Sequence, residues 1–326
     1  MIDKFFEQDV MIQTDSLTRF ASEILKNYGI NDAEVECINF EFNATFSVST
    51  QSGQKFALRL NINSTRVLSN ILAETQWVRD LARIPSINVP APIATLDDQF
   101  VVSALHFDSG QTIYGVMYSW LEGEEIGDEP TLDQLRTVGK AIALMHENDS
   151  DFELRDGAEL PIFNNFFWGT EDFLFSDKSS LSSEDRSLFE EARDLIMQFT
   201  DELYASSPVR IIHADFHGWN LMWHEDQLFI FDFDDCGFGI EVQDIAVALY
   251  WLNTPAAGAA LLEGYRSVRP LPTYSDNAMK ALLLQRRLIL LNYLFETKNA
   301  EHKEMLPAYL KRSIELVSTF LTDVTQ

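Results

Sequence analysis

Two polar segments in the second half of the chain carry the residue types that chemistry requires. Residues 213–220 read HADFHGWN and directly follow an apolar run. Residues 231–235 read FDFDD and end a second apolar run. Carboxylates that follow apolar strands lose their hydration at a large cost in free energy unless they are paired, hydrogen-bonded or bound to a metal. We therefore interpret the two segments as parts of one functional site.

The oxygen atoms of these segments favour a magnesium site. A short connection between the two strand ends would bring Asp215, Asn220 and Asp232 together. Carboxylate and amide oxygens, together with water and phosphate oxygens, are the ligands that Mg²⁺ prefers in proteins. Phosphoryl transfer uses such an ion, and it also needs a carboxylate that orients or deprotonates the attacking hydroxyl. The residues therefore predict Mg²⁺-dependent phosphoryl transfer.

The two motifs, at this spacing, resemble those of known enzyme families. Residues 213–220 are similar to the H-x-D-x-H-x-x-N catalytic loop of the aminoglycoside phosphotransferase and choline kinase families. These families are small-molecule relatives of the protein kinases. Residues 229–235 resemble their metal-binding segment. The resemblance implies an enzyme that uses ATP and Mg²⁺ to phosphorylate a hydroxyl group of a small molecule, with aminoglycosides and amino alcohols as acceptor classes.

The resemblance also implies a role for each residue of the motifs. Asp215 matches the catalytic aspartate, which receives or orients the acceptor hydroxyl. Asn220 and Asp232 match the two ligands of Mg²⁺. His213 would hold the loop from the side of the strand, and His217 would position substrate or support the loop.

Three further aspartates follow these motifs. Asp234 and Asp235 fit a part in the site, and they equally fit a hydrogen-bonded turn or a helix cap. Asp244 lies in a segment that resembles the helix after the catalytic loop, in which an aspartate braces that loop. We interpret Asp244 as a structural residue.

An upstream ion pair is expected if the resemblance is correct. Kinases of this kind use a basic residue on the third strand to contact the α- and β-phosphates, and a helix glutamate to hold it. Arg59 lies at the position of the usual lysine, and Glu74 lies on the following helix. Arginine keeps the charge but changes the reach and the donor geometry. The alternatives are a solvated strand residue for Arg59 and an exposed helix charge for Glu74.

Two other segments match the nucleotide-binding parts of such kinases by position. The turn over residues 41–46 has no glycine, whereas protein kinases use a glycine-rich loop there. Asn43, Thr45 and nearby amides would have to contact phosphate, and an ordinary hairpin is an equal interpretation. The strand that contains Met117 and Ser119 matches the hinge, where backbone groups would bond to adenine.

The apolar pattern predicts the elements that hold these segments. A strand-rich region precedes a mainly helical one, which is an α+β arrangement. With the resemblance, this predicts a protein-kinase-like fold with a small antiparallel-sheet, nucleotide-binding lobe (1–120) and a larger helical, catalytic lobe (121–326). The expected helices cover residues 14–28, 66–83, 131–145, 184–204 and most of the chain from 241, and the expected strands cover residues 35–42, 45–50, 55–60, 100–107, 112–120, 209–212 and 228–233.

The composition limits the partners. The formal net charge of −27 would repel nucleic acids and anionic lipids, so we predict neither as a partner and no association with a membrane. It would attract a cationic acceptor, although solubility or a salt-adapted host is the favoured explanation of the acidity. Cys37 and Cys236 form no recognisable motif, and the N-terminus does not resemble a signal peptide. These features predict a cytoplasmic protein.

Three alternatives stay open at this stage. A zinc hydrolase would use His213, Asp215, His217 and His224, but it leaves the placement of Asn220 and Asp232 unexplained. A nucleotide-binding protein with weak or no catalysis would account for the missing glycines and for the arginine on the third strand. A protein serine/threonine kinase of the same fold would need an activation segment, and the chain shows no such segment after the FDFDD motif.

Overall fold

The structure is a computed structural model that describes residues 5–148 and 152–324. These residues form two compact units. The first unit contains residues 5–125, 152–160 and 222–234, and the second contains residues 126–148, 161–221 and 235–324. Residues 152–160 and 222–234 thus belong to the N-terminal unit, whereas the predicted division between residues 120 and 121 assigned them to the C-terminal lobe. That division into functional lobes stays a prediction.

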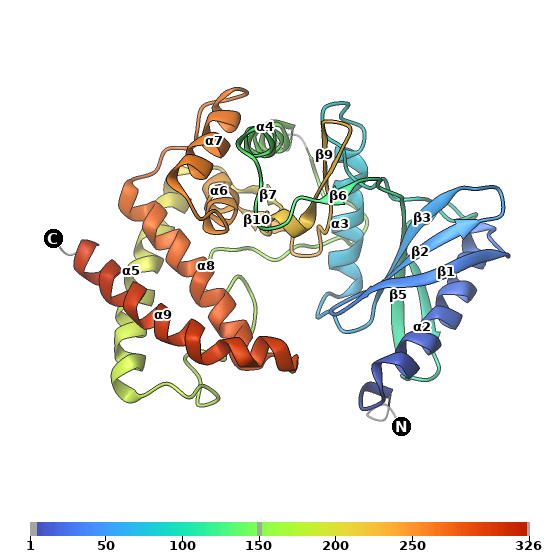
Figure 1. The fold of residues 1–326 in the computed structure, drawn as a ribbon, viewed down its shortest axis with the longest axis horizontal. Coiled ribbons are helices and arrows are strands. Elements are labelled where there is room, and N and C mark those ends of the chain that lie inside the picture. The colour runs from blue at the N-terminus through green and yellow to red at the C-terminus, as the bar shows by residue number, and fades with distance from the viewer. Residues whose placement is uncertain (1–4, 149–151, 325–326) are drawn as a thin grey trace. The chain divides into compact units, whose positions relative to one another are not determined.

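The first unit is built on a five-stranded antiparallel sheet (Figure 1). Its strand order is β1-β2-β3-β5-β4. The helix α2 (Val10–Leu25) packs its apolar side on one face of this sheet and forms the core of the unit with it. The strands are β1 (Ala33–Phe40), β2 (Ala44–Thr50), β3 (Lys55–Asn61), β4 (Val102–His106) and β5 (Gln111–Ser119).

Strand β3 is buried on both faces, and this places its polar residues. Side chains alternate between the two faces of a strand. Leu58 and Leu60 belong to the core under α2, so Arg59 lies on the opposite face. The helix α3 (Leu68–Leu81) meets this opposite face, because its Glu74 contacts Arg59.

A smaller sheet carries the second of the two motifs. It contains β6 (Glu124–Glu125), β8 (Leu221–His224) and β9 (Gln227–Ile230) in the order β6-β8-β9. The two residues between β8 and β9, Glu225 and Asp226, both have positive φ, at 47° and 61°. Two consecutive residues of this kind are what the tightest hairpin turns require.

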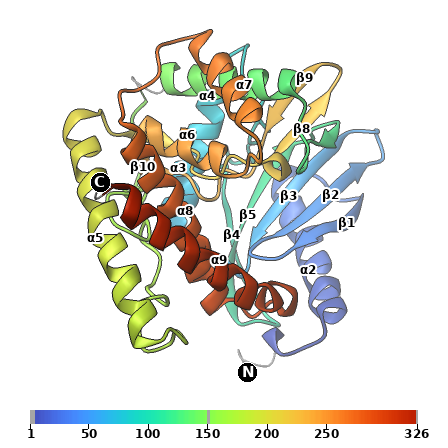
Figure 2. The same ribbon diagram turned by 60° about the vertical axis from the view of Figure 1, so that its left-hand side comes forward.

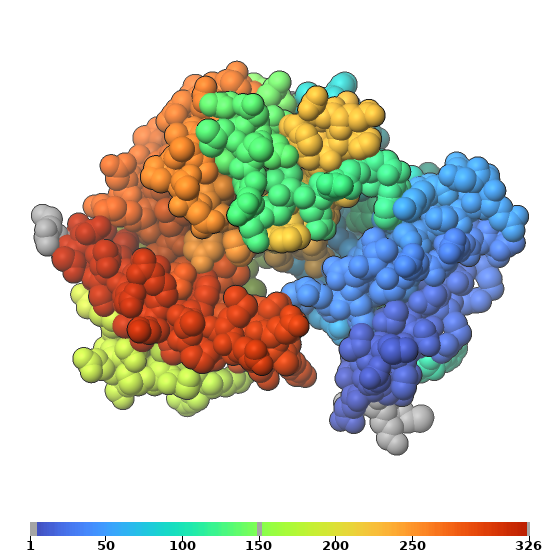
Figure 3. Space-filling view, viewed as in Figure 1, coloured from blue at the N-terminus to red at the C-terminus, as the bar shows by residue number. Residues whose placement is uncertain are grey.

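The second unit is mainly helical. The helix α8 packs against α5, α6 and α9, and both ribbon views show α8 and α9 side by side (Figures 1 and 2). The surface of α9 is exposed along its length in the space-filling view (Figure 3). The unit contains α4 (Leu132–Asn148), α5 (Ser183–Ser206), α6 (Glu241–Tyr250), α7 (Pro255–Arg266), α8 (Asp276–Glu296), α9 (Ala300–Val324), the 3₁₀ turn η3 (Gly218–Asn220), and the strands β7 (Arg210–Ile212) and β10 (Gly237–Gly239).

Two glycines let α4 and α7 approach each other closely. A Cβ atom at Gly139 of α4 would lie 1.9 Å from the carbonyl oxygen of Leu261. A Cβ atom at Gly264 of α7 would lie 1.9 Å from the carbonyl oxygen of Arg136. Real Cβ atoms do not approach a backbone oxygen so closely, so this helix pair depends on both glycines.

The architecture confirms the predicted α+β fold, with an antiparallel sheet followed by a largely helical part. Some details of the prediction were wrong. The strands β8 and β10 were not predicted: β8 is short, and β10 contains two glycines, which strands disfavour. The strand expected over residues 228–233 ends at Ile230, because Asp232 turns to a positive φ of 59°. No helix within residues 5–148 and 152–324 is long and apolar enough to cross a membrane.

Candidate active site

The catalytic-loop motif begins with a strained backbone that one aspartate holds in place. Ala214 has a φ of 67°, a left-handed conformation that costs a residue with a Cβ roughly 1–2 kcal/mol. Asp244, in the first turn of α6, accepts hydrogen bonds from the amide N–H of His213 at 3.1 Å and of Ala214 at 2.6 Å. Hydrogen bonds to a carboxylate are about twice as strong as neutral ones. The brace that the sequence predicted for Asp244 is therefore present.

The carboxylate of Asp215 is the centre of the loop. The amide nitrogen of Asn220 donates to its Oδ2 at 3.0 Å. The Nε2 atom of His217 also lies 3.1 Å from Oδ2. The backbone N–H of Trp219 donates to the Nδ1 atom of His217, so in the neutral ring the proton lies on Nε2 and is donated to Asp215. Three residues of the motif thus meet at one carboxylate.

A third side-chain partner of the Asp215 carboxylate comes from a distant helix. The Nη2 atom of Arg286, on α8, donates to Oδ1 of Asp215 in a close ion pair. Burial alone raises the pKa of the Asp215 carboxyl, but Arg286, followed by His217, more than offsets this and holds the pKa well below its ordinary value. Asp215 is therefore ionised at physiological pH, and it suits the task of orienting a hydroxyl better than that of removing its proton early.

Arg286 is the main residue of this site that the sequence reasoning missed. A signal for it exists in the chain. The apolar stretch over residues 281–295 is interrupted by Gln285, Arg286 and Arg287, and charges in an otherwise apolar helix need partners. The interrupted apolar stretch therefore indicates that Arg286 has a partner. It does not identify Asp215 as that partner, because Asp215 lies 71 residues away in the sequence.

The first unit contains the expected ion pair on β3 and α3. The Nη2 atom of Arg59 donates to Oε2 of Glu74, and the hydroxyl of Tyr118 donates to Oε1 at 3.3 Å. Arg59 is 8% exposed and Glu74 is 3% exposed. Burial alone lowers the pKa of Arg59, but nearby acidic groups, led by Glu74, raise it well above its ordinary value. The alternatives of a solvated strand residue and an exposed helix charge were wrong.

Asp234 extends this cluster toward the turn between β1 and β2. Its Oδ2 accepts from the side chains of Asn43 at 3.2 Å and of Ser64 at 3.3 Å. Its Oδ1 lies 3.9 Å from Nη2 of Arg59. Thr45 pairs with Arg59 across β2 and β3, and paired residues share a face of the sheet. One surface of the sheet therefore carries Asn43, Thr45 and Arg59. Asp234 contacts Asn43 and Arg59 of this surface, and neither a local turn nor a helix cap explains these distant contacts.

The predicted hinge is part of β5. The carbonyl of Met117 accepts from the amide N–H of Ile93 at 2.8 Å, and the amide N–H of Ser119 donates to the carbonyl of Ala91 at 2.8 Å. These two backbone groups are already bonded within the first unit. Binding of adenine at the hinge stays a prediction, and it has to use neighbouring backbone groups.

The two proposed magnesium ligands lie in different units, so their meeting stays a prediction. Asp232 is exposed and follows β9, next to Phe233, which packs edge-on against Trp77 of α3 with 5.4 Å between ring centroids. The amide nitrogen of Asn220 donates to Asp215, and the amide oxygen takes no part in that contact. The amide oxygen is the atom of this side chain that a magnesium ion would bind. A carboxylate and an amide oxygen of this kind fit Mg²⁺.

The zinc alternative would need a cluster of metal-binding side chains. Within the part of the chain that the structure describes, no group of three or more His, Cys, Asp or Glu side chains is arranged to hold a metal ion. His224 lies in β8 of the first unit, whereas His213, Asp215 and His217 belong to the second. The four residues that this hypothesis combined are not one described site.

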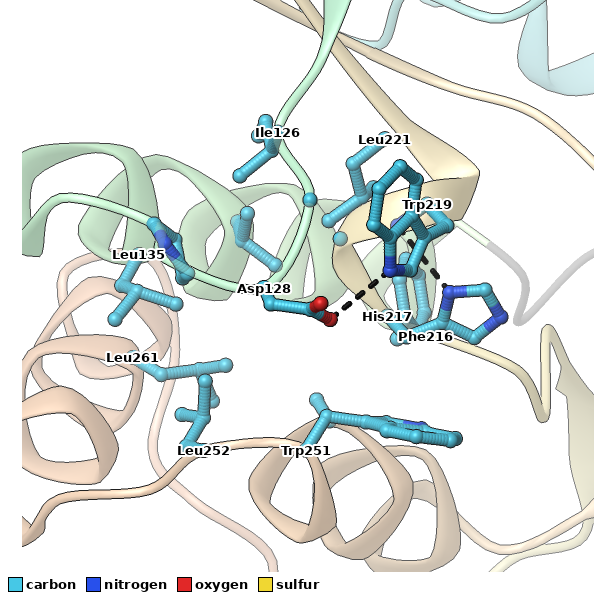
Figure 4. Close-up of a pocket in the computed structure, with 15 residues that line it drawn as sticks. Ile126, Asp128, Leu135, Phe216, His217, Trp219, Leu221, Trp251, Leu252 and Leu261 are labelled. Atoms are coloured by element: carbon cyan, nitrogen blue, oxygen red, sulfur yellow. Dashed lines mark hydrogen bonds between the residues drawn. The ribbon is translucent and has the colours of Figure 1, made fainter. Parts of the chain in front are cut away.

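A pocket lies beside the catalytic loop within the second unit (Figure 4). Asp128 accepts a hydrogen bond from Nε1 of Trp219 at 2.9 Å. The ring of Trp251 lies edge-on to His217, with centroids 5.3 Å apart. The lining is otherwise mostly apolar and includes Ile126, Pro130, Leu135, Val138, Phe216, Leu221, Leu252 and Leu261. One carboxylate and two indole rings thus stand next to the loop that carries Asp215.

Comparison with known proteins establishes the family. Residues 41–274 match the model of the phosphotransferase enzyme family, which is most of the chain. The chain therefore belongs to this family, and the resemblance that the two motifs indicated is confirmed.

The relatives are distant in sequence but close in fold. A microcompartment-associated aminopropanol kinase has a TM-score of 0.78 at 24% identity, with 94% of this chain and 98% of that chain covered. An amicoumacin kinase solved with AMP-PNP and Ca²⁺ has a TM-score of 0.73 at 18% identity, with 91% and 92% covered. The amicoumacin kinase of Bacillus subtilis (strain 168) is 24% identical over 230 residues, which are 70% of this chain and 66% of that protein. These matches confirm the kinase-like fold.

Proposed function

We propose that the protein transfers the γ-phosphoryl group of ATP to a hydroxyl of a small molecule that carries a positive charge. The observation that carries this proposal is the carboxylate of Asp215, which the loop and α8 hold ionised with three side-chain donors. Such a group suits the orientation of an acceptor hydroxyl for in-line attack. The membership of the phosphotransferase family gives the reaction class.

The nucleotide would be held mainly by the first unit. Arg59, kept in place by Glu74, is suited to the α- and β-phosphates. Asn43 and Thr45 would support the phosphates from the turn and from β2, and backbone groups near Met117 and Ser119 would receive adenine. The buried ion pair with Glu74 holds the Arg59 side chain on its face of the sheet, which supports this proposed role.

The metal would be held by Asn220 and Asp232. When bound, the ion would supply positive charge that stabilises the negative charge developing during transfer. Within this chain, Asn220 has a second task, because its amide nitrogen also fixes Asp215 through Oδ2 and the backbone carbonyl, each at 3.0 Å. His217 orients the same carboxylate, and His213 receives the amide N–H of Asp215 on Nδ1 at 3.3 Å.

The preference for a cationic acceptor is supported by the pocket beside the loop. Asp128 offers a carboxylate, and the faces of Trp219 and Trp251 offer the aromatic surface that ammonium groups favour. The net charge of −27 would raise the local concentration of cations. The name of the structural relative that phosphorylates aminopropanol points to the same class of acceptor.

An acceptor screen coupled to ADP release tests this function. It should cover amino alcohols, aminoglycosides, neutral sugars and a generic protein, with Mg²⁺ present and absent. We expect the best acceptor to be a cationic hydroxyl compound. Its KM should stay nearly unchanged when the Debye length falls from about 10 Å at 0.1 M to about 3 Å at 1 M salt, because salt screens exposed charges much more than a contact inside the site. A neutral sugar or a protein as the best acceptor would contradict the proposed acceptor class.

Variants of two aspartates separate the roles of acceptor and metal. Asp215→Asn should keep nucleotide binding but lose transfer, whereas Asp232→Ala should also lose Mg²⁺-dependent nucleotide binding, measured by the rise in melting temperature with MgATP. The control is Asp226→Asn, an exposed aspartate in the hairpin turn. Transfer at the wild-type rate in Asp215→Asn would contradict the assignment.

A further inference from the structure

A buried arginine behind the catalytic carboxylate has so far been given one role only, which is to keep that carboxylate ionised. Arg286 donates Nη2 to Oδ1 of Asp215, and the two side chains are 8% and 17% exposed. Arg286 comes from the middle of α8, whereas the other side-chain donors to Asp215 come from its own loop. The contact therefore ties the loop to a separate helix.

The helix around Arg286 is itself firmly held. Gln285 is fully buried and donates to the carbonyl of Phe166 at 3.0 Å. Arg287 donates to the side chain of Ser313 at 2.9 Å and to the carbonyl of Tyr309 at 3.1 Å. The neighbours on both sides thus point to other partners, and the α8 backbone that carries Arg286 has little freedom to shift.

The distribution of donors over the two oxygens has a chemical consequence. An ionised carboxylate offers about four lone-pair sites. Among the described residues, His217 and Asn220 donate to Oδ2 of Asp215, and Arg286 donates to Oδ1. Both lone pairs of Oδ2 therefore face a donor, whereas Oδ1 faces only the guanidinium of Arg286. The second lone pair of Oδ1 faces none of these three donors.

We propose that Arg286 is a positioning residue for phosphoryl transfer, which fixes the Asp215 carboxylate so that Oδ1 receives the acceptor hydroxyl. This rests on the proposed function. The acceptor would donate its O–H to Oδ1, beside Nη2 of Arg286. Without the guanidinium, the carboxylate would keep its two bonds to Oδ2 and could rotate about them, so the acceptor hydroxyl would lose its alignment with the phosphoryl group.

A merely structural ion pair is the competing explanation, since removal of one partner from a buried pair destabilises a fold. The variants Arg286→Met and Arg286→Lys distinguish the two. A misplacement of about 1 Å can reduce a rate about 100-fold, so we expect Arg286→Met to lower kcat about 100-fold with the KM for ATP unchanged. Arg286→Lys, which keeps the charge, should recover part of the loss.

The neighbour on the same helix supplies a matched control. Arg287 is also a partly buried arginine with hydrogen bonds, but its partners are Ser313 and Tyr309 rather than Asp215. Arg287→Met should lower the melting temperature and leave kcat near that of the wild type. An equal loss of kcat in Arg286→Met and Arg287→Met, measured well below both melting temperatures, would overturn the positioning role.

A double-mutant cycle with Asp215→Asn closes the test. If Arg286 acts through Asp215, the two changes should be non-additive in the free energy of unfolding, and Arg286→Met should not lower any residual transfer that Asp215→Asn retains. Additive unfolding energies would overturn the proposal without any activity measurement. Absence of transfer by the wild-type protein would instead refute the proposed function, so the two failures are distinguishable.

Discussion

Neutralising Glu74 is the sharpest test of the ion pair on β3 and α3. The change Glu74→Gln keeps the size of the side chain and its oxygen acceptor but removes the charge that faces Arg59. Both side chains are buried, with Glu74 3% exposed and Arg59 8% exposed. The change therefore leaves a guanidinium in the interior without its main counter-ion.

The magnitude follows from the burial and from what remains. Removal of one partner from a buried pair costs about 3–5 kcal/mol. Asp234 still lies 3.9 Å from the same guanidinium, so part of the charge stays compensated, and we expect the lower end, about 3 kcal/mol. In a domain of this size each kcal/mol shifts the melting temperature by about 2–4 °C, which gives a decrease of about 6–12 °C.

The matched control is Asp80→Asn on the same helix. Asp80 pairs with Arg83 at 3.7 Å, but the two side chains are 45% and 68% exposed. Exposed pairs contribute about 0–1 kcal/mol, so this variant should lose at most about 4 °C. Calorimetry with and without MgATP measures both quantities, and we expect Glu74→Gln also to lose the rise in melting temperature that MgATP gives. Equal melting temperatures for the two variants would refute the reasoning.

Three further changes test other parts of the molecule. Burial lowers the pKa of His106, so stability should fall as the pH drops below about 6.5 toward the lower pKa of the folded state. His106→Gln should reduce this loss of stability. The prediction would be contradicted if the free energy of unfolding fell by the same amount in the variant and the wild type between about pH 7.5 and about pH 5.5. Gly264→Ala should reduce the free energy of unfolding by about 3 kcal/mol or more, because the new Cβ would meet a backbone oxygen. The control is Gly258→Ala on the same helix, whose Cβ would meet only a flexible side chain at 3.3 Å. Thermal unfolding should show this control to be neutral or slightly stabilising. Asp128→Asn should raise the KM for a cationic acceptor about tenfold and leave that for a neutral one unchanged, and equal changes for both acceptors would argue against a role in charge recognition.

Local patterns predicted those parts of the site that lie close together in the sequence. Asp215, His217 and Asn220 fall within six residues, and the structure brings their side chains into contact as the motif indicated. The pair of Arg59 with Glu74 was also predictable, because a strand and the helix that follows it are adjacent in space as well as in sequence. In these cases the spacing itself limits the geometry.

Contacts that depend on tertiary packing were not predictable in the same way. Arg286 reaches Asp215 only because α8 packs beside α6, and no periodicity in the helix specifies that neighbour. The sequence left Asp234 open between a part in the site and a turn or helix cap, since its partner Asn43 lies 191 residues away. Asp128 becomes part of a pocket wall because its side chain meets Trp219, which lies 91 residues further along the chain.

The helix α6 joins two sites that a protein engineer would prefer to vary separately. Its first turn carries Asp244, which holds the catalytic loop, and Trp251, at its C-terminal end, forms part of the pocket wall. A helix of ten residues is about 15 Å long and behaves as a rigid rod. Replacing Trp251 to admit a bulkier acceptor would therefore alter the end of the helix that holds the loop, whereas Leu252, beyond the helix, and Leu261, on α7, line the pocket without belonging to α6.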